Sequence, residues 1–318
     1  MHKLSIQSTG AIAQHDLEKG YRQIAEAGFH CVDFGFDSFL QGWMIQNDNI
    51  NKVFLRPIEE IWEDFKPHAE LAAKYGLTFE QSHAPFPLKT PGRDNLNKKM
   101  MQATENCFAI AHRMGSHYIV EHPVHLWNAA RDEQYAYNKE MYLSLIAMAK
   151  EYKLTVCLEN LFVERNAHLF EGMGSDIAES VRLIDELNEA AGEELFGFCF
   201  DTGHANLLGK NMYQSLTMLG NRLKILHIHD NDGVSDLHTM PFTFERSWNS
   251  CATDWEGFLC GLHDIHYEGV LNFEVFRLMN SFPEEIHPAV LRLLEETGQY
   301  FSKKIQESAD GIRKDENP

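Results

Sequence analysis

Basic residues are scarce in this chain. Its 318 residues include 28 lysines and arginines against 47 aspartates and glutamates, which gives a formal net charge of −19 at pH 7. Such a charge repels a phosphate backbone unless the basic residues cluster on one face, and the sequence shows no such cluster. We therefore expect no nucleic acid among its partners.

Long apolar runs and paired cysteines are also missing. No run approaches the ~20 residues that a membrane span needs, and residues 1–10 lack the apolar core of a signal peptide. The six cysteines form no C-x-x-C pair, which leaves out zinc-ribbon and thioredoxin motifs. We expect a cytoplasmic protein with reduced thiols and no membrane partner.

Short β-rich runs alternate with amphipathic, helix-like runs along the chain. Eight strands are predicted, at Leu4–Gln7, Cys31–Gly35, Leu77–His83, Tyr118–Glu121, Leu154–Glu159, Gly197–Asp201, Leu223–His229 and Val270–Val275. Helices are predicted at Asp16–Ala27, Pro57–Tyr75, Leu96–Met114, Glu133–Tyr152, Asp176–Ala190 and Pro288–Lys303. Strands separated by helices pair in parallel, and a count of eight favours a single α/β domain of the (β/α)8 TIM-barrel type. The expected catalytic domain is residues 1–307, followed by a polar C-terminal tail, 308–318.

Two connections are longer than a bare barrel requires. Asp37–Arg56 follows the second strand and Asn231–Thr253 follows the seventh, both at the end of the barrel where such enzymes build their sites. Phe36, Phe39 and Trp43 beside or within the first connection could wall a pocket, or could only pack the loop.

Acids and imidazoles occupy the ends of most predicted strands. Parallel strands bring these ends to one mouth, and packing alone does not explain so many there. The residues are His83, His122, Glu159, Asp201, His227, His229 and Glu274.

The carboxylates among them indicate a metal site. Glu159 and Glu274 each end an apolar strand, where a buried carboxylate normally pairs or binds a metal. The alternative is a salt bridge, but few basic residues occupy strand ends. Asp201 adds a third carboxylate, and a histidine from Leu226–Gly233 adds an imidazole. Such a hard, oxygen-rich set favours Mn²⁺, with Mg²⁺, Co²⁺ or Zn²⁺ as alternatives.

A metal in this mouth would chelate a carbonyl and its neighbouring hydroxyl and would acidify the adjacent C–H. Glu159 and Glu274 come from different sides of the ring, so one could remove a proton and the other return it. In the histidine segment, alternation places His227 and His229 on the same side, and either could be the ligand. Asp236 and His238 could belong to the site or to a solvated acidic loop.

The chain resembles the xylose-isomerase-like TIM-barrel superfamily over nearly its full length, particularly the sugar isomerases and ketose 3-epimerases. The segments that carry the resemblance are EAGFHCVDF, SHAPF, CLENL, CFDTGHANLLG, HIHDNDGVSDLH and GVLNFE. The resemblance implies a metal held by Glu159, Asp201, His227 and Glu274, because the family's H-x-x-D pattern selects His227. It also implies Glu159 and Glu274 as the catalytic acid/base pair and His204 as a substrate contact. We expect further substrate contacts from His83, His122, Asp236, His238 and Arg277.

Other readings remain open on the same residues. The endonuclease IV group of this superfamily holds a multinuclear zinc site with nine residues, and each has a counterpart here, at His83, His122, Glu159, Asp201, His204, His227, Asp236, His238 and Glu274. Against it, the stretches after Glu159 and after His238 lack the glycine-containing segments of those nucleases. A dehydratase would begin with the same proton abstraction, and a sugar-binding protein would need no catalysis. The sequence leaves open whether the small-molecule partner is a sugar or a sugar phosphate, and whether the chain forms a homo-oligomer.

Overall fold

Eight parallel strands form a barrel in the computed structural model, which describes residues 1–244 and 252–307. The strands follow in the order β1 (Leu4–Gln7), β2 (Cys31–Gly35), β3 (Gln81–His83), β4 (Tyr118–Val120), β5 (Thr155–Glu159), β8 (Phe196–Asp201), β9 (Leu223–His227) and β10 (Leu271–Phe273). Beyond the end of β9, the N–H of Ile228 donates to the Asn272 carbonyl (2.9 Å) and the N–H of Glu274 donates to the Ile228 carbonyl (3.0 Å). These bonds join β9 to β10 and confirm the predicted (β/α)8 barrel.

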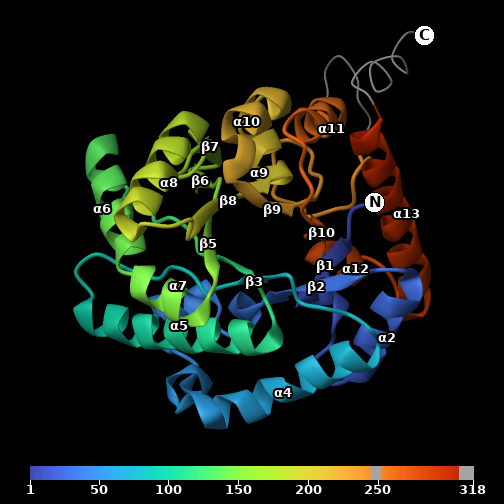
Figure 1. Ribbon diagram of the computed structural model, residues 1–318, viewed down its shortest axis with the longest axis horizontal. Coiled ribbons are helices and arrows are strands. Elements are labelled where there is room, and N and C mark those ends of the chain that lie inside the picture. Colours follow the sequence, from blue (N-terminus) through green and yellow to red (C-terminus); the bar gives the residue numbers. More distant parts are fainter. Residues whose placement is uncertain (245–251, 308–318) are drawn as a thin grey trace.

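Helices surround the strands on the outside (Figure 1). The longer ones are α2 (Leu17–Ala27), α4 (Ile58–Lys74), α5 (Asp94–Met114), α6 (Arg131–Leu143), α7 (Ile146–Tyr152), α8 (Ile177–Ala191), α10 (Met212–Leu219), α11 (Trp255–Asp264) and α13 (His287–Gln306). Shorter elements lie in the connections, at α1 (Ser8–Ala11), η1 (Phe36–Ser38), α3 (Gly42–Gln46), η2 (Lys52–Leu55), α9 (Thr202–Leu207), η3 (Gly220–Arg222), α12 (Phe276–Asn280) and η4 (Glu284–Ile286). None of the helices among the described residues is both long and apolar enough to cross a membrane.

Local sequence signals set the helix ends. Asp16 and Asp176 precede α2 and α8, and each side chain accepts a hydrogen bond from a backbone N–H in the first turn. Gly28 and Gly192 end the same helices with φ of 105° and 76°, a conformation that glycine adopts without steric cost. The sequence therefore determines where these two helices begin and end.

The structure differs from the predicted elements in two places. The helix predicted over Glu133–Tyr152 is two helices, α6 and α7, separated at residues 144–145. The chain after β5 forms an antiparallel hairpin, β6 (Phe162–Arg165) with β7 (His168–Glu171), which was not predicted. Its two turn residues, Asn166 and Ala167, both have positive φ (54° and 60°), and the alanine hides the usual signature of such a turn. The expected tail, 308–318, lies outside the described residues.

The barrel interior changes from apolar to polar toward the site. Val120, Cys157, Cys199 and Ile225 pack together inside it, apart from the larger core that also joins strands to helices. A buried polar group is centred on Asp33 of β2, whose Oδ2 accepts hydrogen bonds from Gln81 Nε2 (3.1 Å) and Asn272 Nδ2 (2.9 Å). A buried carboxylate inside a barrel must be hydrogen-bonded, and this one lies next to the strand-end residues described below.

Candidate metal centre and active site

A cavity of about 550 Å³ opens where the barrel strands end. Its size is that of a small-molecule site. Seven of the residues predicted for the site line it: His83, His122, Glu159, His204, Asp236, His238 and Glu274. The remaining wall residues are Gln7, Thr9, Asp37, Ser38, Gln41, Phe86, Leu161, Phe162 and Phe276.

The four predicted ligands form one cluster at this cavity. Glu159, Asp201 and His227 end β5, β8 and β9, and Glu274 follows β10. All four are buried, and their candidate ligand atoms lie within 4.8 Å of one another. The ends of these four neighbouring strands thus bring together side chains that are up to 115 positions apart in the chain.

His227 is oriented by groups on both sides of its ring. Nδ1 lies 3.2 Å from Glu159 Oε1 and 3.5 Å from Glu274 Oε2, so it faces the carboxylates. Nε2 points the other way, 3.5 Å from Asp33 Oδ2. Nδ1 is therefore the atom that would bind a metal, and Asp33 lies behind the ring as the nearest charged group to Nε2.

Among the described residues, only imidazoles lie close enough to balance the negative charges of the carboxylates in this cluster. Burial alone would raise the pKa of Glu159, but His227, His122 and His204 hold it well below its usual value. Burial raises the pKa of Glu274, with His227 and His238 opposing this. Within the described residues, no lysine or arginine pairs with Glu159, Asp201 or Glu274. A divalent cation fits this donor set, because three buried carboxylates without a basic partner are costly.

Neighbouring amides and an imidazole hold two of the carboxylates in place. Gln7 Nε2 donates to Glu274 Oε1 at 2.7 Å. Asn160 brackets the backbone of Asp201, donating to its carbonyl and accepting from its N–H, both at 2.8 Å. His229 Nε2 lies 3.0 Å from the Asp201 carboxylate. His229 thus orients Asp201, whereas His227, two residues earlier, faces the other carboxylates.

Gly203 makes room for that histidine. A Cβ at this position would lie 1.9 Å from Cε1 of His229, closer than any side-chain contact allows. The glycine of the Asp-Thr-Gly-His sequence is thus required by the close approach of an imidazole ring.

Two further groups of ligand-type side chains border the central cluster. In the first, His83 Nε2 lies 3.0 Å from His122 Nε2, which in turn lies 2.9 Å from Glu159 Oε2. Its three candidate ligand atoms are also within 4.8 Å of one another. Phe86 covers His122, with ring centroids 3.9 Å apart. This group extends the central cluster toward β3 and β4.

The second group is His204, His229, Asp236 and His238, again with ligand atoms within 4.8 Å. His238 Nε2 lies 2.9 Å from Asp236 Oδ2, and the rings of His229 and His238 stack at 3.9 Å. Burial alone would raise the pKa of Asp236, but His204 and His238 lower it far below the usual range. Because Asp236 and His238 also line the cavity and contact each other, they belong to the site rather than to a solvated loop.

Some expected contributors lie elsewhere. Arg277 is exposed on α12, with its guanidinium 5.7 Å from the Phe276 ring, and does not line the cavity. Phe36 and Phe39 pack against Phe34 in an aromatic cluster, and Trp43 is 57% exposed. Phe36 and Phe39 therefore pack against the second strand, and none of the three aromatics lines the cavity.

The sequence reasoning missed several wall residues. Gln7 ends β1 in the same way as the acids end other strands, but it is neither an acid nor an imidazole and so does not indicate a site by its residue type. Thr9 and Asp37 lie two residues beyond the ends of β1 and β2, and only this position near a strand end marks them. Phe162 and Phe276 carry no polar signal at all.

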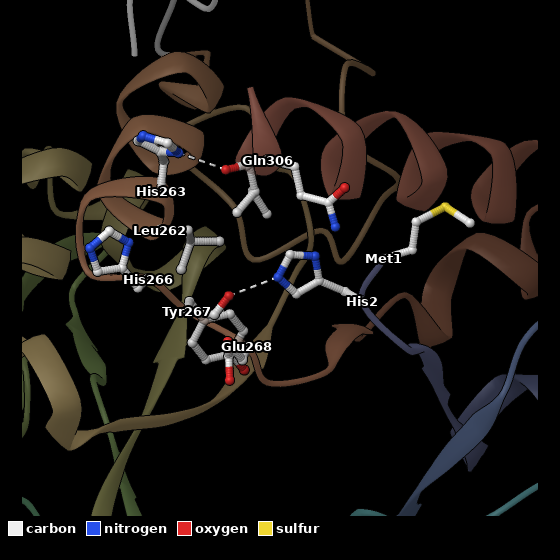
Figure 2. A pocket seen from close by; sticks show the side chains of 9 residues that line it. Met1, His2, Leu262, His263, His266, Tyr267, Glu268 and Gln306 are labelled. Carbon is white, nitrogen blue, oxygen red and sulfur yellow. Dashed lines mark hydrogen bonds between the residues drawn. The ribbon is translucent and has the colours of Figure 1, made fainter. Parts of the chain in front are cut away.

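A second cavity, of about 450 Å³, lies beside the residues that precede β1 and β10 (Figure 2). Two of its three histidines are engaged with the main chain: His2 Nε2 lies 2.8 Å from the Tyr267 carbonyl and His263 Nδ1 lies 2.8 Å from the Ile305 carbonyl. This cavity is at the opposite end of the strands from the metal cluster, where barrel residues serve stability rather than chemistry.

The fold and the site together define a class of protein. The family described as "xylose isomerase-like TIM barrel" matches residues 21–297, and the chain belongs to it. The predicted family membership is thereby confirmed.

Individual relatives are distant. A curated relative, "Uncharacterized protein y4fM" of Sinorhizobium fredii, is 29% identical over 140 residues, which is 42% of this chain and 43% of the relative. The chain therefore spans less than half the length of this relative. A solved D-tagatose 3-epimerase-like protein is 20% identical, with a TM-score of 0.68, over 95% of this chain and 98% of its own. The IOLI protein, solved with a binding zinc atom, is 15% identical, with a TM-score of 0.63, over 95% and 97%. At these identities the two structures show the fold.

Proposed function

We propose that this protein is a metal-dependent isomerase or epimerase of a small sugar. The observation that carries the proposal is the buried cluster of Glu159, Asp201, His227 and Glu274 at the floor of a small-molecule cavity. Support comes from the donor set, which suits Mn²⁺ best and admits Mg²⁺, Co²⁺ or Zn²⁺. The epimerase name of one structural neighbour and the zinc atom of another agree with it.

The reaction would move a proton beside a carbonyl. A divalent ion, when bound, polarises the carbonyl and acidifies the adjacent C–H. Glu159 and Glu274 act as the acid/base pair, one taking the proton from carbon and the other returning it. His122 Nε2 holds Glu159 Oε2 at 2.9 Å and Gln7 Nε2 holds Glu274 Oε1 at 2.7 Å, so each carboxylate keeps one oxygen for the substrate or the ion. The imidazole of His204 lines the cavity and is placed to bind a sugar hydroxyl through Nε2, since its Nδ1 is held by the Asn160 carbonyl. His238 also lines the cavity, but its two ring nitrogens are engaged with the Glu274 carbonyl and with Asp236, so it would meet a sugar through the face of its ring.

Deuterium exchange tests this proposal. The Mn²⁺-loaded protein is incubated in D₂O with a panel of ketoses and aldoses, and the label beside the carbonyl and the isomeric products are followed by NMR. We expect label and an isomer from at least one sugar, with the rate lowered about 10²–10⁴-fold in Glu159→Gln and Glu274→Gln. Glu164→Gln is the matched control, because Glu164 is exposed on the neighbouring hairpin. A protein that binds its ion but labels none of the sugars is not an isomerase.

A second candidate is an endonuclease IV-like AP endonuclease with a multinuclear zinc site. The two additional groups, His83–His122–Glu159 and His204–His229–Asp236–His238, favour it, since each could hold an ion. Cleavage of a duplex with an abasic site, lost with chelator and restored with Zn²⁺, would establish it. Three ions per chain would support the nuclease, and one ion the sugar enzyme.

A dehydratase on the same scaffold shares the first step with the epimerase. It would release water, so its product is 18 mass units lighter by the loss of H₂O, whereas an epimer keeps the mass. A cytoplasmic location stays a prediction from the sequence, and the oligomeric state stays open. The described cysteines Cys31, Cys107, Cys157 and Cys199 form no disulfide, which agrees with a reducing compartment.

A further inference from the structure

Asp33 is a carboxylate that points into the barrel from the middle of β2. Its neighbours Val32 and Phe34 belong to the larger core, so alternation along the strand turns Asp33 toward the barrel interior. It is 0% exposed, and no lysine or arginine of the described residues lies within ion-pair distance of it. A fully buried carboxylate is costly unless it is paired or hydrogen-bonded, so its presence here calls for a physical reason.

Two amide side chains hold this carboxylate in one orientation. Gln81 Nε2 on β3 and Asn272 Nδ2 on β10 both donate to Asp33 Oδ2, at 3.1 and 2.9 Å. β10 and β2 lie on either side of β1 in the barrel, so Asn272 reaches across one strand to make its contact. Side chains of three strands therefore fix the position of Oδ2.

His227 Nε2 approaches the same oxygen from β9. The two atoms are 3.5 Å apart, which is longer than a hydrogen bond, and Nε2 has no other partner among the described residues. Cys199 also lies near the ring, but burial raises the pKa of its thiol well above the usual value, so it stays a neutral and weak acceptor. Asp33 is therefore the strong acceptor on the Nε2 side of the ring.

The two nitrogens of this imidazole have different tasks. A neutral imidazole carries its proton on one nitrogen and can bind an ion only through the other. Nδ1 faces Glu159 and Glu274, at 3.2 and 3.5 Å, and is the nitrogen on the side of the ligand cluster. The proton must then sit on Nε2, and an acceptor behind Nε2 favours that tautomer. Asp33 Oδ1 has no partner among the described residues, so the carboxylate can take one more donor.

We propose that Asp33 is a positioning residue of the metal centre, which accepts a hydrogen bond from His227 Nε2–H and so keeps Nδ1 free to bind the divalent ion. The inference rests on the proposed function, since it concerns the same metal centre. Shortening the 3.5 Å separation to about 3.0 Å makes this hydrogen bond. Asp33 does not line the cavity, so it acts through His227 and not on the substrate.

Metal titration of Asp33→Asn tests the proposal without requiring turnover. The asparagine keeps an oxygen for the amides of Gln81 and Asn272, so the barrel interior stays hydrogen-bonded, but it removes the negative charge that holds Nε2–H. We expect the Mn²⁺ affinity, measured by calorimetry, to fall about 10–100-fold. Circular dichroism and urea unfolding of the metal-free variant show whether the fold is kept.

Asp230→Asn is the matched control. Asp230 is equally buried, but its carboxylate accepts from Thr253 Oγ1 (2.6 Å) and from the Asn231 N–H (2.9 Å), so the substitution should leave Mn²⁺ affinity unchanged. A second comparison separates positioning from simple attraction between Asp33 and the ion. In His227→Gln, adding Asp33→Asn should weaken Mn²⁺ binding by less than about threefold, because the residue through which Asp33 acts is gone. An equal loss in both backgrounds would show that Asp33 acts only as a distant charge and would reject the positioning role.

NMR of the ¹⁵N-labelled, Zn²⁺-loaded protein locates the proton directly. Zn²⁺ takes the place of Mn²⁺ here because it is diamagnetic. We expect the His227 ring to carry its proton on Nε2, with a downfield N–H resonance that exchanges slowly with water and is missing in His227→Gln. In Asp33→Asn this resonance should move upfield and exchange faster, whereas a role in folding alone would leave it unchanged. A proton on Nδ1 in the wild type, or undiminished Mn²⁺ affinity in Asp33→Asn, would overturn the proposal.

The outcome is separable from that of the proposed function. A protein whose Mn²⁺ affinity depends on Asp33 through His227, but which labels none of the sugars in D₂O, would keep the positioning residue and reject the isomerase. Labelled sugars together with an Mn²⁺ affinity that Asp33→Asn leaves unchanged would keep the isomerase and reject the positioning residue.

Discussion

Replacing Glu121 with glutamine should stabilise the metal-free protein, by an amount that grows with pH. Glu121 follows β4, is 0% exposed, and has no hydrogen-bond partner for either carboxylate oxygen among the described residues. Val120 beside it packs inside the barrel, so alternation turns Glu121 toward the helices and away from the site. Burial raises its pKa to about 8, with His83 opposing the shift.

The sign and size follow from the proton balance. Between the unfolded value of 4.5 and about 8, the folded protein holds a proton on Glu121 and the unfolded chain does not. Wild-type stability therefore falls as pH rises through this window, by about 1.36 kcal/mol per pH unit. Glutamine has no proton to lose, so Glu121→Gln escapes this decline. The expected gain is near zero at pH 4.5 and roughly 3 kcal/mol at pH 7, and it levels off above pH 8.

Urea unfolding at pH 5, 6, 7 and 8 in the presence of chelator measures the gain. The chelator keeps metal binding from adding its own pH dependence. Glu105→Gln, an exposed glutamate on α5, is the control and should give a flat difference near zero. A Glu121→Gln difference that does not change with pH would refute the reasoning, because it would mean that Glu121 titrates alike in both states.

Three other perturbations have outcomes set by single contacts. Mn²⁺ at 100 times its dissociation constant should stabilise the wild type by about 2.7 kcal/mol, and calorimetric melting of Asp201→Asn should show little of this gain. Gly203→Ala should lower stability by about 1–3 kcal/mol and weaken Mn²⁺ binding, because the methyl would displace His229 from Asp201. Gly42→Ala, where the nearest atom to the new methyl is 3.4 Å away, should do neither when both are measured by urea unfolding and metal titration. Asp176→Ala should cost about 1 kcal/mol in the same unfolding assay through loss of the α8 cap, with unchanged Mn²⁺ affinity as the mark of a purely structural role.

The sequence predicted the site residues that lie at the ends of barrel strands. Short β-rich runs located the barrel strands, and the residue that ends the run belongs to the buried ligand cluster in Glu159, Asp201 and His227. The same signal fails for Glu121. It too is a glutamate after an apolar run, but the strand ends one residue earlier, so the next residue, His122, reaches the cavity. A shift of one residue in the strand end decides whether Glu121 or His122 points into the cavity. The position of that end depends on how the strand pairs with its neighbours.

Other parts of the site depend on contacts between distant segments. Asp37 and Thr9 approach each other beside Gly35 because a glycine has no Cβ to hold them apart, and neither loop alone specifies that. Likewise, His227 and His229 are equivalent by alternation. Only the folded chain shows that one faces Glu159 and Glu274 while the other holds Asp201.

The choice between the two candidate functions rests on the histidines around the central ligands. Both functions use Glu159, Asp201, His227 and Glu274, so the cluster by itself favours neither. In a sugar enzyme, His122 serves Glu159 by hydrogen bonding to the oxygen that faces away from His227, which leaves the other oxygen for the ion. In a nuclease, the same nitrogen would bind a second ion and could not hold Glu159. The wall of the cavity adds an argument from outside the histidines, because four carboxylates line it and no lysine or arginine of the described residues does. A DNA backbone is held largely by lysine and arginine contacts to its phosphates, which this wall does not offer. The wall of the cavity therefore favours the sugar over the abasic site.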